Sequence, residues 1–406
     1  MANFDLTRRL ARKEGGKILL LVMDGLGGLP IEPDGPTELE AANTPNLDRL
    51  AKEGSTGMTI PIARGIEPGS GPAHMALFGY DPLVYDIGRG ALEAMGIGLD
   101  VGPDDVAARG NFCTVDDNGV ITDRRAGRIA TDKAAEVVAR LTDITLPGVE
   151  VTVREVKEHR FALRLRGKGL SPHLHDTDPQ AAGAKPLAAV PSVDSPEAKH
   201  TAELVNAFIA EAAKRLKGHL PANMLTLRGF AGDPALPKFQ DVYKLNPACV
   251  AVYPMYRGVA SLVGMKIVET DAKDTPADEF KRVAGVWAQH DFVFCHIKYT
   301  DSRGEDGDFN AKKAVIEQVD AALPILLDLK PDTLIVTGDH STPARLKSHS
   351  WHPVPLLLWA PATHMPDRAQ CFGERECMTG ALGQFPATDL MQLALAHAHR
   401  LERFGA

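Results

Sequence analysis

The stretch "TLIVTGDHSTP" (333–343) begins with an apolar, β-branched run and then places Asp339 and His340 almost directly after it. A short apolar run that ends in polar ligand-type side chains is typical of a buried strand whose carboxyl end faces a site. Two further histidines, His349 and His352, follow, so that four such groups stand within fourteen positions. This segment therefore predicts a strand whose carboxyl end carries the side chains of a functional site.

Two other apolar runs end in the same way. The run "KILLLVMDG" (17–25) ends at Asp24, and "DFVFCHIKYTD" (291–301) ends at Asp301. Short apolar runs alternate with helical patterns along the chain, which favours an α/β fold with a mostly parallel central sheet flanked by helices. Because ligands bind outside the carboxyl ends of strands in such sheets, we expect these aspartates and Asp339 to converge at one edge.

Three converging carboxylates favour a metal site. One aspartate after a strand is usually a turn residue or a helix cap. Several carboxylates in a low-dielectric cleft repel one another, and a bound cation is the usual remedy. Histidines beside carboxylates suit Zn²⁺ or Mn²⁺ better than Ca²⁺. The number of ligands exceeds what one tetrahedral ion needs, which predicts two ions about 4 Å apart.

Composition limits the class of protein. The chain has 406 residues, 45 of them basic and 53 acidic, for a formal charge of −8. The length predicts two or three domains, and the charge argues against nucleic-acid or anionic-membrane partners. Five scattered cysteines favour a reducing compartment, and the longest apolar run, Ile18–Met23, is too short to cross a bilayer. We expect a soluble cytoplasmic protein that binds a small molecule; its oligomeric state stays open.

The glycine-rich loop "EPGSGPAHMALFGYDP" (67–82) contains a candidate nucleophile, Ser70. Pro72 is predicted to open a helix, which would place Ser70 just before the helix N-terminus. In one interpretation Ser70 only caps this helix. In the other, the positive helix end favours a phosphate and Ser70, activated by metal, attacks it. His74 is expected to pack within the helix.

A segment between these motifs is predicted to be an inserted domain. Asp24 and Ser70 lie far from Asp301 and Asp339 in sequence, yet all should meet in space. We therefore expect a catalytic domain formed by 1–108 and 238–406, interrupted by an α+β cap domain at 109–237. The cap carries basic groups suited to carboxylate and phosphate: "ARGN" (108–111), "DRRAGR" (123–128) with Arg125 and Arg128, His159-Arg160, and Arg228. As an alternative, the arginines of 123–128 are solvated turn residues.

The ordered motifs resemble the alkaline phosphatase superfamily, and within it the archaeal-type cofactor-independent phosphoglycerate mutases. The segments that carry the resemblance are "LVMDGLGGLP", "AANTPNLDRLAKEG", the Ser70 loop, "ARGNFCTVD", "DRRAGRI", "DTDP", "PANMLTLRG", "HIKYTDSRGEDGDF" and "TGDHSTP". They span nearly the whole chain. The resemblance implies an alkaline-phosphatase-like core with an inserted cap.

The resemblance also implies two divalent ions. One would be held by Asp24, Ser70, Asp339 and His340, and the other by Asp301, His349 and a third group. Mn²⁺ is the expected ion, with Zn²⁺, Co²⁺ and Mg²⁺ as alternatives, and no bisphosphoglycerate is expected. The implied substrate contacts are Arg109, Arg128, Arg228, Arg257 and Lys298.

Three positions depart from the family pattern. The family normally has a histidine where this chain has Glu305, in "TDSRGEDG", and usually an aspartate where it has His352. Either the ligand types have been exchanged around one ion, or His352 serves the substrate or an outer shell. Glu305 is also compatible with a solvated loop position. The family commonly has Asp after the serine, whereas this chain has Gly71.

The resemblance implies an isomerase that interconverts 3-phosphoglycerate and 2-phosphoglycerate in glycolysis and gluconeogenesis, through a phosphoserine and without bisphosphoglycerate. Alternatives are a metal-dependent phosphatase, a phosphotransferase on another small hydroxyl metabolite (homoserine kinase-like), and a non-catalytic phosphometabolite-binding protein. Loss of the nucleophile would favour the last, but Ser70 is present.

Overall fold

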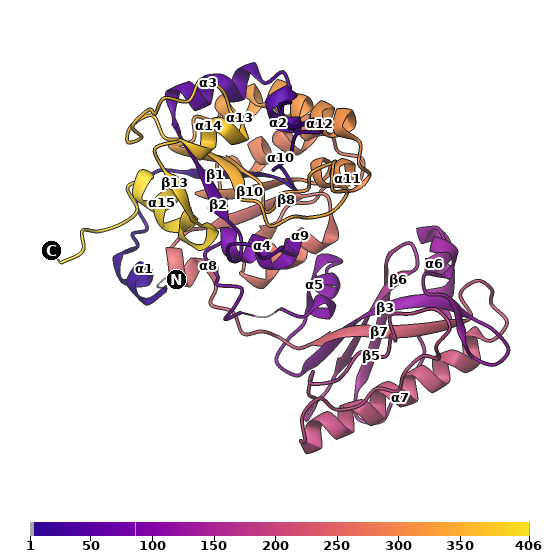
Figure 1. The fold of residues 1–406 in the computed structure, drawn as a ribbon. Helices are drawn as coiled ribbons and strands as arrows, with labels where there is room; N and C mark the ends of the chain where they lie inside the picture. The colour runs from indigo at the N-terminus through magenta and orange to yellow at the C-terminus, as the bar shows by residue number, and fades with distance from the viewer. Residues whose placement is uncertain (1–3, 86, 406) are drawn as a thin grey trace. The chain divides into compact units, whose positions relative to one another are not determined.

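The computed structural model describes residues 4–85 and 87–405 and divides the chain into two compact units (Figure 1). One unit is built from the segments before Ile87 and after Leu236, and the other from Ile87–Leu236. The second unit begins before residue 109, the expected start of the cap. The physical reason is a small core in which Leu99 and Val101 pack with Ala107 of the sheet.

The first unit is built on an eight-stranded sheet with the strand order β13–β2–β12–β11–β1–β10–β8–β9. The strands are β1 (Ile18–Met23), β2 (Ser55–Ile60), β8 (Pro247–Ala251), β9 (Lys266–Ile267), β10 (Phe292–Ile297), β11 (Thr333–Thr337), β12 (Val354–Trp359) and β13 (Gly383–Pro386). Only β12 runs antiparallel to its neighbours β11 and β2. The predicted α/β class with a mostly parallel sheet is confirmed.

Helices cover both faces of this sheet, which explains why β1 is apolar along its whole length. On one face, α3 (Pro45–Glu53), α10 (Pro276–Trp287) and α12 (Phe309–Ala322) share a core with alternate residues of β1. Figure 1 shows α4 (Ser70–Leu77) and α9 (Pro254–Leu262) on the other face. The remaining helices of this unit are α1 (Phe4–Leu10), α2 (Glu38–Ala41), α8 (Phe239–Tyr243), α11 (Tyr299–Glu305), α13 (Pro324–Leu327), α14 (Glu374–Met378) and α15 (Leu390–His397), with the 3₁₀ turn η2 (Ala387–Asp389).

The sheet register brings the predicted strand ends to one edge. Strand β1 pairs in parallel with β10 and β11, so Met23 lies opposite Ile297 and the residues that follow all three strands emerge together. Strand β10 ends at Ile297, however, and not at Asp301 as expected. The chain turns there into the short helix α11, whose Thr300 hydroxyl donates to the Asp24 carbonyl. This contact holds Asp301, in the first turn of α11, against the end of β1.

The second unit has an antiparallel sheet with the order β4–β3–β6–β5, and β7 also pairs with β3. Its elements are β3 (Asp105–Val115), β4 (Ile121–Asp123), β5 (Glu150–Lys157), β6 (Arg160–Arg166), β7 (Met224–Ala231), α5 (Arg89–Gly96), α6 (Thr131–Ala139), α7 (Pro196–Leu216) and the 3₁₀ turn η1 (Ala126–Arg128). Helix α7 buries Val205 and Phe208 in the core of this sheet. Within residues 4–85 and 87–405, no helix combines the length and apolar character needed to cross a membrane.

Candidate metal centre

Asp24, Asp339 and His340 form one of two groups of possible metal ligands in the described ranges. His340 Nε2 lies 3.4 Å from Asp24 Oδ1 and 3.2 Å from Asp339 Oδ2. Ser70 Oγ lies 3.1 Å from the same nitrogen. The three ligand side chains are buried, and they follow β1 and β11 at the sheet edge. The fold therefore brings together four residues from three segments that are widely separated in sequence.

Ser70 is the first residue of α4, and Gly69 occupies the N-cap position with an extended backbone. The helix therefore begins before Pro72, where the sequence predicted its start. Because Gly69 and not Ser70 occupies the cap position, the Ser70 hydroxyl does not serve as the helix cap. His74, one turn later, donates from Nδ1 to the Ser70 carbonyl at 2.8 Å. The hydroxyl itself faces His340.

The first group fits a divalent cation. Asp24 Oδ1 and Asp339 Oδ2 are buried and accept no well-aligned hydrogen bond within residues 4–85 and 87–405, although His74 Nδ1 and His340 Nε2 each lie 3.2 Å from Asp339 Oδ2. Their companion oxygens are held: Gly25 N–H donates to Asp339 Oδ1 at 3.0 Å, and Tyr256 donates to Asp24 Oδ2. A buried acceptor without a partner costs about 1–3 kcal/mol. A cation between the two oxygens would offset this cost, and mixed oxygen and nitrogen donors suit Mn²⁺ or Zn²⁺.

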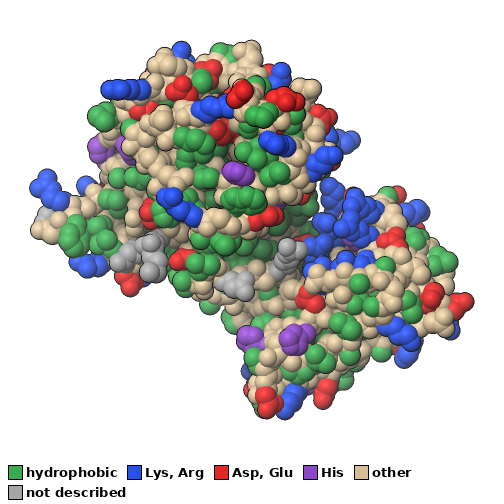
Figure 2. Space-filling model, in the orientation of Figure 1, with side chains coloured by type: hydrophobic (Ala, Val, Ile, Leu, Met, Phe, Trp, Pro, Cys, Tyr) green, Lys and Arg blue, Asp and Glu red, His purple; other side chains and the backbone are tan. Residues whose placement is uncertain are grey.

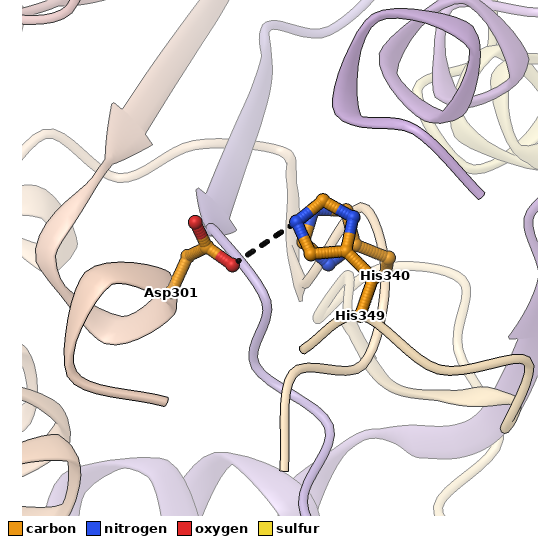
Figure 3. A group of neighbouring side chains, drawn as sticks. All are labelled: Asp301, His340 and His349. Atoms are coloured by element: carbon orange, nitrogen blue, oxygen red, sulfur yellow. Dashed lines mark ion pairs between the residues drawn. The ribbon is translucent and has the colours of Figure 1, made fainter. Parts of the chain in front are cut away.

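Asp301, His340 and His349 form the second group, and its ligand atoms all lie within 4.8 Å of one another. His349 Nε2 lies 3.5 Å from Asp301 Oδ1, and the two histidine rings stack with centroids 3.7 Å apart (Figure 3). His349 Nδ1 donates to the Pro68 carbonyl at 2.9 Å, which leaves the Nε2 lone pair free for a cation. Because His340 belongs to both groups, the two candidate sites are adjacent.

The surroundings of the two groups favour an ionised Asp24 and a neutral His340, which are the forms that bind metal ions. Lys298 Nζ lies 3.0 Å from Asp24 Oδ2 and also contacts Asp301. Burial alone would raise the pKa of Asp24, but Lys298 and the nearby histidines outweigh burial and hold this pKa well below its usual value. Burial would lower the pKa of Lys298, yet the two carboxylates raise it overall. Burial lowers the pKa of His340, which favours a neutral imidazole with a lone pair.

Glu305 and His352, the two unusual positions, lie in different surroundings. Glu305 is at the rim of the second group: its carboxylate lies 3.9 Å from His349 Nε2 and its side chain is 54% exposed. Burial, followed by the charge of Asp301, raises the pKa of Glu305. Neither Glu305 nor His352 belongs to either group, and the Nδ1 of His352 lies 3.1 Å from the Ser350 hydroxyl. The geometry therefore favours Glu305 over His352 as an additional ligand.

Replacing Glu305 and His352 one at a time tests which of them is the third ligand of the second group. We expect Glu305→Ala to weaken metal binding at the second group by about 10–100-fold or more, because this variant lacks the carboxylate that we infer to be a third ligand. His352→Ala is the matched control and should bind metal like the wild type. Metal content after dialysis against limiting Mn²⁺ measures both. Equal metal loss in the two variants, or loss only in His352→Ala, would contradict the assignment.

Three predicted substrate residues share one face of the sheet in the second unit. Arg109 on β3 lies opposite Arg228 on β7, and Asn111, two residues along β3, lies opposite Arg160 on β6. Because residues two apart on a strand point to the same side, the three arginines lie on one face. Arg228 Nε lies 3.4 Å from the carboxylate of Asp176. Figure 2 shows Lys and Arg side chains gathered on the surface of this unit.

The other predicted substrate residues are placed differently. Arg125 and Arg128 are exposed in the turn after β4. His159 is buried, and burial together with the charge of Arg160 lowers its pKa to about 4, so it is neutral near pH 7. Arg257 belongs to the first unit, in α9, and its Nε is buried without a hydrogen-bond partner in the described ranges.

Several residues that surround the candidate ligands were not predicted from the sequence to support them. Tyr256 donates to Asp24, and His296 Nε2 lies 3.4 Å from the same carboxylate. Lys312 is fully buried, and Thr342 contacts ligands of both groups. Lys312 does have a sequence signal, because it falls on the apolar stripe of α12 with Val315, Ile316 and Val319. The contacts of Tyr256 and His296 link distant segments and have no local signal.

Comparison with known proteins identifies the relatives of this chain. Residues 51–223 match the sequence profile described as 2,3-bisphosphoglycerate-independent phosphoglycerate mutase. A probable 2,3-bisphosphoglycerate-independent phosphoglycerate mutase from a Thermotoga species is 52% identical, with 99% of each chain covered.

Two solved structures are similar over nearly the full length. The PH0037 protein from Pyrococcus horikoshii has 31% identity and a TM-score of 0.83, covering 97% of this chain and 100% of that one. A cofactor-independent phosphoglycerate mutase from Thermoplasma acidophilum has 32% identity and a TM-score of 0.73, covering 94% and 100%. The chain belongs to the family of 2,3-bisphosphoglycerate-independent phosphoglycerate mutases.

Proposed function

We propose that this protein interconverts 3-phosphoglycerate and 2-phosphoglycerate, independently of 2,3-bisphosphoglycerate, through a phosphoserine on Ser70. The observation that carries the proposal is the position of Ser70 Oγ, 3.1 Å from His340 Nε2, a nitrogen that also lies 3.4 Å from Asp24 Oδ1 and 3.2 Å from Asp339 Oδ2. A hydroxyl at the start of a helix and next to a cation site is suited to attack phosphorus. The names of relatives at about half identity support the same activity.

The reaction needs two balanced phosphoryl transfers. Ser70 Oγ forms a bond to phosphorus while the bond from phosphorus to the C3 oxygen breaks, and the proton lost by Ser70 ends on that glycerate oxygen. Glycerate then reorients, and its C2 oxygen attacks the phosphoserine, which returns the proton to Ser70. Positioning supplies most of the rate in phosphoryl transfer because little covalent chemistry is left to the protein. Excluding water prevents hydrolysis of the phosphoserine.

The proposed centre holds two divalent ions, with Mn²⁺ as the first candidate. Asp24, Ser70, Asp339 and His340 would hold one, and the other would be held by Asp301, His349 and Glu305. When bound, such ions stabilise charge on the transferring phosphoryl group and favour the deprotonated serine. Lys298 is proposed to keep a fixed positive charge beside Asp24 and Asp301.

Arginines of the second unit are proposed to bind the carboxylate and phosphate of the substrate. Arg109, Arg160 and Arg228 share one sheet face, and Arg125 and Arg128 lie in the exposed turn after β4. A guanidinium fork matches both anionic groups in two-point hydrogen bonding. The neutral His159 can contribute a hydrogen bond without adding charge. The free cysteines suit a reducing compartment, and we propose the cytoplasm.

A coupled assay tests the proposed function. Purified protein is given 3-phosphoglycerate and Mn²⁺ without bisphosphoglycerate or nucleotide, and formation of 2-phosphoglycerate and of free phosphate are followed separately. We expect 2-phosphoglycerate without phosphate release, and loss of turnover after chelation that added Mn²⁺ reverses. Phosphate release alone would make the protein a phosphatase. Turnover that chelation leaves unchanged would contradict a metal-dependent mutase.

A further inference from the structure

Thr342 lies at the junction of the two candidate metal groups. Its side chain is fully buried in the loop that follows β11, two residues after His340. Its Oγ1 lies 2.7 Å from Asp301 Oδ1 and 3.0 Å from His340 Nδ1. Asp301 belongs to the second group and His340 to both, so this one hydroxyl contacts ligands of both sites.

The direction of the two hydrogen bonds follows from the number of protons. A threonine hydroxyl has one proton, and Thr342 donates it to Asp301 Oδ1. The contact between His340 and Thr342 therefore needs a proton on His340 Nδ1, donated to Oγ1. The resulting chain runs from His340 Nδ1–H to Thr342 Oγ1–H to Asp301 Oδ1. It leaves the lone pair of His340 on Nε2, the atom that faces Asp24, Asp339 and Ser70.

The surrounding backbone holds Thr342 in this place. Lys312 Nζ donates to the Thr342 carbonyl at 2.9 Å and to the carbonyls of Gly25 and Gly27, just after Asp24. Gly25 has φ +62°, and a Cβ there would overlap Thr342 Oγ1. A Cβ on Gly304 would overlap the Thr342 carbonyl oxygen. Both chain segments therefore approach Thr342 more closely than any larger residue would allow.

We propose that Thr342 is a positioning residue that selects the Nδ1–H form of His340 and ties the ligands of the two metal groups together. Hydrogen bonds of this outer kind orient metal ligands and typically change metal affinity by about 10–100-fold. The inference rests on the proposed metal centre but not on the identity of the reaction. This role requires no contact between Thr342 and the substrate.

The test compares Thr342→Val with Thr342→Ser in the full chain. Valine keeps the shape and the backbone contacts but lacks the hydroxyl, whereas serine keeps the hydroxyl and lacks the methyl group. Mn²⁺ affinity at both sites is measured by titration calorimetry against a competing chelator. We expect Thr342→Val to bind both ions about 10–100-fold more weakly than Thr342→Ser, which stays near the wild type.

Four outcomes are decisive. Equal affinities in the valine and serine variants would overturn the role of Thr342, and weakening at only one site would overturn its link between the groups. Failure of the wild type itself to bind two ions would instead overturn the metal centre. Long-range ¹⁵N–¹H spectra of histidine-labelled protein give a second measurement: metal-free wild type should show His340 protonated at Nδ1, and Thr342→Val should lose this preference. An Nε2–H form in the wild type would also overturn the proposal.

Discussion

The Ser70→Ala protein is expected to lose mutase turnover by about 10⁴-fold or more, because no other group at the site replaces the oxygen that accepts the phosphoryl group. Folding should change little, since the Ser70 hydroxyl is not the cap of α4. The kcat of the purified variant in the coupled assay measures the loss. An intact-mass spectrum adds a direct readout: wild type mixed with substrate should carry one phosphoryl group, and the variant none.

A second serine distinguishes catalysis from helix capping. Ser195 does cap a helix: its Oγ accepts the Ala198 N–H at the start of α7. Ser195→Ala should therefore cost about 1 kcal/mol of stability and leave kcat close to that of the wild type. The phosphoserine route is excluded if Ser70→Ala keeps more than a tenth of the wild-type turnover. A phosphorylated Ser70→Ala protein would exclude it as well.

The arrangement of the ligands could be predicted from the sequence because it follows from strand periodicity. Asp24 comes directly after an apolar run and Asp339 one residue after another, and parallel strands in register deliver their following residues to one edge. For Asp301 the sequence predicts the correct edge of the sheet but the wrong element, because this residue lies in helix α11 and not at the end of a strand. Alternate positions stay apolar through Tyr299, so the charged Lys298 after Ile297 is compatible with a continuing strand and does not mark the end of β10. The turn into α11 depends on a tertiary contact between Thr300 and the Asp24 backbone.

The supporting contacts could not be predicted in the same way. Tyr256 is 232 positions from Asp24 along the chain, and Lys312 is 287 positions from Gly25. Neither pairing leaves a periodic pattern, since each depends on how α9 or α12 packs against the sheet edge. The position of Lys312 within an apolar stripe was the one available clue, because lysine is almost never fully buried unless its charge is compensated. A charged residue at an apolar position of a helix pattern therefore indicates that it has a polar partner in the core.

Asp339→Asn is expected to abolish binding of the ion at the first group and to lower mutase turnover by at least roughly 10³-fold. The amide has nearly the same shape, and its oxygen can still accept the Gly25 N–H that Asp339 Oδ1 now accepts. The other position then presents an NH₂ group toward His340, where the carboxylate presents a lone pair. Metal content by mass spectrometry and kcat in the coupled assay should fall together.

A buried aspartate outside the metal centre provides the matched control. Asp320 in α12 is 2% exposed, and its carboxylate accepts the Leu47 N–H at 2.7 Å and the Asn46 side-chain amide at 3.2 Å. Asp320→Asn should lower stability by about 1–3 kcal/mol, because an amide replaces one of two satisfied acceptors, and should leave metal content unchanged. A variant at Asp339 that kept both ions would contradict the assignment of this carboxylate as a ligand. If Asp320→Asn lost metal to the same extent, the loss at Asp339 would reflect unfolding, whereas loss confined to Asp339 ties turnover to the metal itself.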